Sequence, residues 1–74
     1  MGTLIRFARH ARRRMKWREI SEEEVNLVLE NPDKMEESVR GRINAYKNIE
    51  KRYIKVTYRK LSNEILIISV VDKA

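Results

Sequence analysis

The stretch that decides the fold of this chain is Ile20–Pro32, ISEEEVNLVLENP, because it carries both the start and the end of a helix. Ser21 and Glu24 form an S-x-x-E capping box, in which each side chain accepts a hydrogen bond from the other residue's backbone N–H. Ile20 and Val25 occupy the two positions of a hydrophobic staple. The sequence therefore predicts a helix that begins directly after the serine and ends before the Asn-Pro pair, since a residue before proline disfavours the helical conformation.

An earlier segment also has helical spacing. Phe7, Ala8, Ala11 and Met15 recur at intervals of three or four residues, which predicts a helix over residues 8–18. After Pro32 the period changes to that of strands. We expect strands at 35–39, which is an edge strand or a loop, and at 42–49, 53–60 and 65–71, with 61–64 as a hairpin connection.

These elements predict an α+β fold in which two N-terminal helices pack on one face of an antiparallel sheet of three to four strands. Residues 3–7 are a further short strand or a lead-in to the first helix. The nearly all-apolar segment 65–71 is typical of a strand in the middle of a sheet. The second face of the sheet is too polar to be covered by core, and it is expected to carry Asn44, Tyr46, Lys55, Thr57 and Arg59.

Composition limits the chemistry that the chain performs. Its 74 residues make one domain, 1–74, with no cysteine and one histidine. Disulfides, thiolate zinc sites and a cysteine nucleophile are therefore excluded, and we expect neither a metal nor another cofactor. No apolar run approaches the roughly 20 residues of a membrane span, so we expect a cytoplasmic protein without a membrane partner. The abundance of Lys, Arg, Glu and Ile suits a thermophile.

Charge is distributed in three blocks. Residues 1–20 hold seven basic and one acidic residue, residues 21–37 hold one and seven, and residues 38–74 hold nine and three. The balances are +6, −6 and +6, which sum to the net charge of +6. If the basic blocks share a face, that face attracts polyanions; otherwise the charges form a solvated surface.

The basic residues of the first helix do not all have the same position. With about 100° per residue, Arg9, Arg12, Arg13 and Lys16 lie opposite the buried face and are solvated. His10 and Arg14 lie one turn apart on one flank. Arg18 lies near the apolar stripe, so we expect its charge to reach out at the helix end or to pair with a carboxylate or a carbonyl.

One pattern extends over roughly residues 10–71: His10-Ala11-x-x-Arg14-Met15-x-x-Arg18-x-Ile20-Ser21-x-x-x-Val25, Leu29-x-Asn31-Pro32, Gly41-Arg42 and Val56-x-Tyr58. It resembles a family of small prokaryotic proteins that is classed only as a domain of unknown function. That family in turn resembles the RelE/ParE toxin superfamily, and in pattern most of all the BrnT toxins. The family usually has glycine where Glu19 stands here, and Thr-Val where this chain has Ser69-Val70.

The resemblance implies a RelE-like fold and a metal-independent endoribonuclease of a toxin–antitoxin pair. Its expected partners are RNA, an antitoxin protein and a second copy of the chain. Such chemistry needs a proton acceptor, a proton donor and cations around the phosphorane. On this hypothesis the catalytic residues are His10, Arg14 and Tyr46, and the nucleic-acid-binding residues are Arg18, Arg42, Lys47, Lys55 and Arg59.

Two other interpretations remain open. In one, the chain binds single-stranded nucleic acid without cleaving it, through Arg42, Lys55 and Arg59 together with Tyr46 and Tyr53. His10 is then a structural histidine at the core boundary. In the other, the polar sheet face or an edge strand is covered by a partner protein or a second copy. Tyr58 is expected in the core and Lys47 on an exposed strand.

Overall fold

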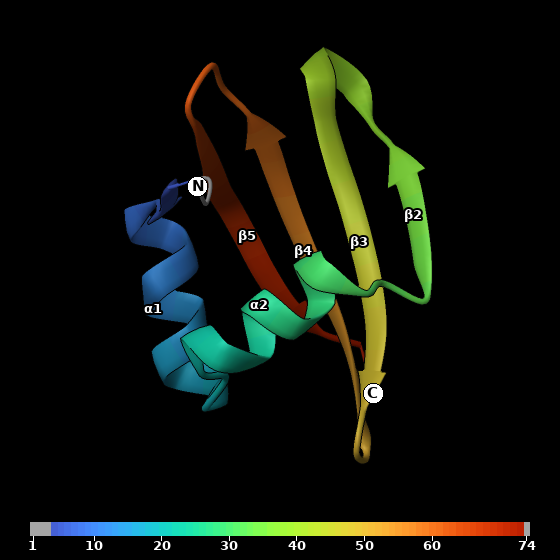
Figure 1. Cartoon of the computed structure of the whole chain (residues 1–74). Coiled ribbons are helices and arrows are strands. Elements are labelled where there is room, and N and C mark those ends of the chain that lie inside the picture. The colour runs from blue at the N-terminus through green and yellow to red at the C-terminus, as the bar shows by residue number, and fades with distance from the viewer. Residues whose placement is uncertain (1–3, 74) are drawn as a thin grey trace.

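The computed structural model describes residues 4–73 and confirms the α+β class, with two helices on one face of a sheet (Figure 1). A short 3₁₀ turn at Val39–Gly41 joins two of the strands. In chain order the regular elements are β1 (Leu4–Phe7), α1 (Arg9–Arg18), α2 (Glu22–Glu30), β2 (Lys34–Glu37), β3 (Arg42–Ile49), β4 (Arg52–Lys60) and β5 (Glu64–Asp72).

The sheet has five strands in the order β1-β5-β4-β3-β2, and β1 runs parallel to β5 while the other pairs are antiparallel. The prediction of an antiparallel sheet of three to four strands was therefore wrong in number and in direction. Two strands of only four residues, β1 and β2, account for the difference. Alternation over so few residues is a weak signal, and tertiary pairing decides it. Thr3, where the first predicted strand began, lies outside the described residues.

The capping of α2 is confirmed in full. The Ser21 hydroxyl accepts the Glu24 N–H at 3.1 Å, and the Glu24 carboxylate accepts the Ser21 N–H at 2.9 Å. Ile20 and Val25 are both buried, as the staple requires. The helix ends at Glu30 with Asn31 as its C-cap, which confirms the prediction that it ends before the Asn-Pro pair.

The core lies between the helices and the sheet. Helix α1 packs on β5, and α2 lies across β3 and β4 (Figure 1). Each fully buried aliphatic side chain contributes about 1.5–3 kcal/mol relative to exposure. Neither helix of the described chain has the length and apolar character to cross a membrane. The buried members of this core are Ala11, Met15, Ile20, Val25, Val28, Ala45, Ile54, Val56, Tyr58, Ile67 and Val70.

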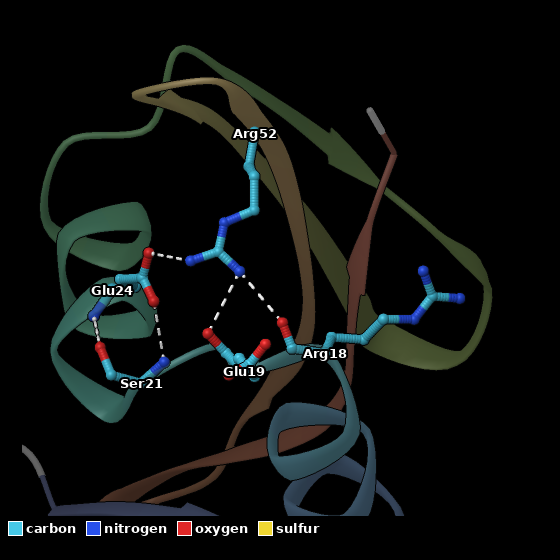
Figure 2. A network of polar contacts seen from close by, with 5 residues as sticks. All are labelled: Arg18, Glu19, Ser21, Glu24 and Arg52. Carbon is cyan, nitrogen blue, oxygen red and sulfur yellow. Dashed lines mark hydrogen bonds and ion pairs between the residues drawn. The ribbon is translucent and has the colours of Figure 1, made fainter.

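Arg52 joins β4 to the connection between the two helices (Figure 2). Its guanidinium donates to the Glu24 carboxylate at 2.7 Å and to the backbone carbonyls of Arg18 and Glu19 at 3.1 and 3.2 Å. Glu24 thus uses one carboxylate oxygen for the cap of α2 and the other for Arg52. Three hydrogen bonds from Arg52 therefore hold the end of α1, the start of α2 and the start of β4 together.

Glu19 takes the position that favours glycine after a helix. Its φ of 56° and ψ of 46° are left-handed. Its N–H donates to the Lys16 carbonyl and the next N–H, of Ile20, donates to the Met15 carbonyl at 2.8 Å. These two bonds are those of a Schellman motif, and both Met15 and Ile20 are buried beside it. The turn between the helices is therefore formed although glycine is absent.

We expect Glu19→Gly to raise the free energy of unfolding by about 0.5–1 kcal/mol, because glycine adopts the left-handed region without a Cβ clash. The measurement is urea denaturation followed by circular dichroism. The matched control is Glu23→Gly in the first turn of α2, which should lower the free energy of unfolding by about 1 kcal/mol. A lower stability for Glu19→Gly would show that the Glu19 side chain itself stabilises the turn.

Candidate nucleic-acid interface

No element within residues 4–73 covers the face of the sheet opposite the two helices (Figure 1). We call it the open face. Because Ile54, Val56 and Tyr58 of β4 point into the core, the alternate residues of that strand point the other way, as predicted. The strand register extends this assignment to the whole sheet. The open face consists of Leu4, Arg6, Lys34, Glu36, Arg42, Asn44, Tyr46, Asn48, Tyr53, Lys55, Thr57, Arg59, Glu64, Leu66, Ser69 and Val71.

Two stacked tyrosines form the aromatic part of the open face. The rings of Tyr46 and Tyr53 have centroids 5.6 Å apart and planes at 20°. Lys34 and Lys55 lie on either side of Tyr46 in the strand register, with their ammonium nitrogens 5.5 and 6.0 Å from its ring centroid. Tyr46 is consequently only 9% exposed, whereas Tyr53 is half-buried and keeps part of its surface open to solvent. Tyrosine and cation are thus already positioned beside each other.

The hydroxyl of Tyr46 donates to the Glu36 carboxylate at 2.7 Å. This hydrogen bond, followed by the charge of Lys34, holds the pKa of Glu36 below its ordinary value. The same hydrogen bond, together with burial, raises the pKa of Tyr46. Glu36 therefore stays ionised and Tyr46 stays protonated at neutral pH. In this pair the tyrosine serves as a proton donor, and the carboxylate fixes its direction.

The hydrogen bond between Tyr46 and Glu36 makes the stability of the protein depend on pH in a defined direction. A depressed folded-state pKa of Glu36 stabilises the protein fully above the unfolded-state value, near 4.5, and the contribution is lost as the pH falls through the folded-state pKa. We therefore expect Glu36→Gln to lose less stability than the unchanged protein on acidification below pH 4.5, measured as urea midpoints across pH. Glu37→Gln, the next residue along β2, is the control and should keep the original slope. Equal slopes for Glu36→Gln and the unchanged protein would contradict the assignment.

Of the residues predicted from sequence, Arg42, Tyr46, Lys55 and Arg59 lie together on the open face. Sequence reasoning missed Lys34 and Glu36, because their side of the sheet depends on the pairing of the short edge strand β2 with β3. Thr57 and Asn44 were expected on this face, and there the Thr57 hydroxyl donates to the Asn44 side-chain oxygen at 2.8 Å.

The other predicted residues lie elsewhere. His10, Arg14 and Arg18 belong to α1, which packs on the opposite face of the sheet, so the structure does not bring His10 and Arg14 to Tyr46. His10 is exposed and Arg14 half-buried. Arg18 reaches out at the helix end, as expected, with its guanidinium 5.9 Å from the Trp17 ring and directed away from Arg52 (Figure 2).

Lys47 also points to the helix side of the sheet. Its ammonium donates to the Asn31 carbonyl at 2.9 Å and lies 3.7 Å from the Asp33 carboxylate. Lys47 therefore fastens the segment after α2 to β3. Within residues 4–73 no group of three or more His, Cys, Asp or Glu side chains gathers where a metal ion could bind.

Comparison with known proteins assigns the chain to a sequence family. A family model described as Domain of unknown function (DUF4258) matches residues 7–72, which is nearly the whole chain. No curated protein and no solved structure matches.

Proposed function

The chain belongs to the DUF4258 family, and we propose that it is a toxin-like RNA-binding protein whose open face holds single-stranded RNA. The observation that carries this proposal is the stacked pair Tyr46–Tyr53 with Lys34 and Lys55 beside it. Aromatic rings stack on bases of any sequence, and lysine and arginine attract the backbone phosphates. An exposed sheet presents both groups in a fixed geometry, so the protein loses little conformational entropy when RNA binds.

The charges of the open face support the same proposal. Both of its acidic residues are paired with cations, Glu64 with Arg6 at 2.9 Å and Glu36 with Lys34 at 3.6 Å. Arg42, Lys55 and Arg59 make no ion pair within residues 4–73. Three phosphate contacts by these cations predict that the logarithm of the binding constant falls with the logarithm of salt concentration with a slope of about −2.

We further propose metal-independent cleavage of the bound RNA, in the cytoplasm, held in check by an antitoxin that covers the open face. Cleavage needs a proton acceptor for the ribose 2′-hydroxyl, cations for the phosphorane and a proton donor for the leaving oxygen. On the open face the Glu36 carboxylate would take the proton of the 2′-hydroxyl, and Lys34 and Lys55 would supply the cations. The Tyr46 hydroxyl, which donates to Glu36 in the free protein, would give its proton to the leaving oxygen and regain one from the protonated Glu36. His10 and Arg14, one turn apart on α1, are the competing catalytic set.

One experiment tests binding and cleavage together. Purified protein is incubated with single-stranded RNA in EDTA, and affinity and RNA integrity are measured for the unchanged chain and for Tyr46→Phe, His10→Ala and Arg14→Ala. Tyr53→Phe is the matched control because it also removes a hydroxyl and keeps the ring. Loss of cleavage in Tyr46→Phe alone would assign the chemistry to the open face, and loss in His10→Ala and Arg14→Ala would assign it to α1.

The remaining outcomes separate the other interpretations. Salt-sensitive binding with intact RNA in every sample would leave a binding module without chemistry. Neither binding nor cleavage would contradict the proposal and would leave the open face as a surface for a protein partner or a second copy.

A further inference from the structure

A row of arginines crosses the open face at the end that is away from the tyrosine pair. Arg42 of β3 is the direct register partner of Arg59 on β4, and Arg59 is the partner of Leu66 on β5. Leu66 is in turn the partner of Arg6 on β1. Neighbouring strands are about 4.8 Å apart, so the sheet holds Arg42 and Arg59 side by side.

This arrangement is unfavourable for the folded protein alone. Like charges directly opposite each other in a sheet are destabilising. Arg6 is neutralised by Glu64, but neither Arg42 nor Arg59 has an ion pair or a side-chain hydrogen bond with any of residues 4–73. Both are exposed. The unpaired arginines of α1 differ, because they spread around a helix, whereas the sheet keeps these two guanidinium groups together.

We propose that Arg42 and Arg59 form a clamp for a terminal phosphate monoester, and that this clamp binds the phosphorylated end of the RNA on the open face. Two guanidinium forks match a group with about −2 charge and three terminal oxygens. An internal phosphodiester has one charge and two free oxygens, so it satisfies only one fork. The inference rests on the proposed function for the identity of the ligand, but not for the phosphate chemistry.

The distance between the two arginines and the tyrosine pair fits a phosphate at the end of an RNA strand better than one in its middle. Arg42 and Tyr46 lie four residues apart on the same face of β3, which corresponds to about 13 Å. A phosphate at Arg42 and Arg59 thus leaves the tyrosine pair free for a base further along the same RNA. Strand β3 begins at Arg42, directly after Arg40 and Gly41, which both have positive φ, so β3 itself does not extend past the two arginines.

The test compares one short RNA with a 5′-phosphate, with a 3′-phosphate and with hydroxyls at both ends, by fluorescence anisotropy at constant salt. We expect one phosphorylated form to bind roughly tenfold to a hundredfold more tightly than the unphosphorylated form. Arg42→Gln and Arg59→Gln should each abolish that preference. Lys60→Gln, which removes a neighbouring charge on the other face of β4, is the matched control and should retain it.

A second measurement does not depend on RNA. Inorganic phosphate, compared with chloride at equal ionic strength, should raise the midpoint of thermal unfolding of the unchanged chain but not of the two arginine variants. Without phosphate, each arginine variant should itself unfold at a higher temperature than the unchanged chain, because the repulsion is removed. If Arg42 or Arg59 instead stabilised the fold, its replacement would lower the unfolding temperature.

The outcomes separate the clamp from the proposed function. Stabilisation by phosphate without any RNA binding would support the clamp, with a free phosphorylated small molecule as its ligand, and would contradict RNA binding. RNA binding with equal affinity for all three ends and no stabilisation by phosphate would overturn the clamp and leave the proposed function standing.

Discussion

Replacing Tyr53 with alanine is expected to weaken the binding of single-stranded RNA by about 1–3 kcal/mol, or roughly fivefold to 150-fold. Tyr53 is the more accessible ring of the stacked pair, and Tyr46 stacks against it with ring centroids 5.6 Å apart. Loss of this ring removes the stacking surface for one base while the cations of the open face remain. Affinity measured by anisotropy at several salt concentrations should therefore fall, with the salt slope unchanged.

Tyr53→Phe is the matched control, because phenylalanine keeps the ring and should bind within about twofold of the unchanged chain. Thermal unfolding of both variants shows whether the fold is retained. Binding by a folded Tyr53→Ala at the original affinity would show that RNA does not stack on this pair.

Replacing Glu24 with alanine is expected to lower the free energy of unfolding by about 2–4 kcal/mol. The substitution removes half of the capping box of α2 and leaves the half-buried guanidinium of Arg52 without its carboxylate. A core of this size supplies only about 3–5 kcal/mol of net stability. At the middle of both ranges about 1 kcal/mol remains, so roughly one Glu24→Ala molecule in six should be unfolded at 25 °C, as judged by urea denaturation and circular dichroism.

Three further variants make this prediction specific. Glu23→Ala changes the exposed neighbour in the same turn and should alter stability by no more than about 0.5 kcal/mol. Glu24→Gln retains a side-chain oxygen for Ser21 or Arg52 and should lose less than Glu24→Ala. A double-mutant cycle with Arg52→Met measures the coupling between the two side chains. A coupling energy near zero would show that Arg52 stabilises the fold only through the backbone carbonyls.

Much of the local structure follows from the sequence because local physical chemistry decides it. The capping box of Ser21 and Glu24, the end of α2 at Asn31 and the bounds of β3 were all predicted correctly. The sequence also contains a signal for the position of Arg52. Extending the alternation of β4 by one step places its charge on the same side as Ile54, where it needs a partner.

The arrangement of the layers was harder to predict. The pairing of β1 with β5 joins segments far apart in the chain, and nothing local to Ile5 or Phe7 specifies it. His10 and Tyr46 were combined in one catalytic set because their chemistry suits it. They belong to different layers, since His10 lies on a helix that covers one face of the sheet and Tyr46 faces the other way. Single-sequence patterns show which residues share an element, but not which elements share a surface.

The position of β5 between β1 and β4 affects how the protein folds during its synthesis. Strand β1 leaves the ribosome before the other four strands, but the strand with which it pairs, β5, is the last of the five. Until residues 64–72 have emerged, β1 has no neighbour in the sheet and the apolar surface of α1 has no strand to pack on. Contacts of such long sequence separation slow folding and prolong the exposure of apolar surface. The nascent chain therefore passes through a period in which its basic helix and unpaired strands are accessible to other molecules before the open face exists.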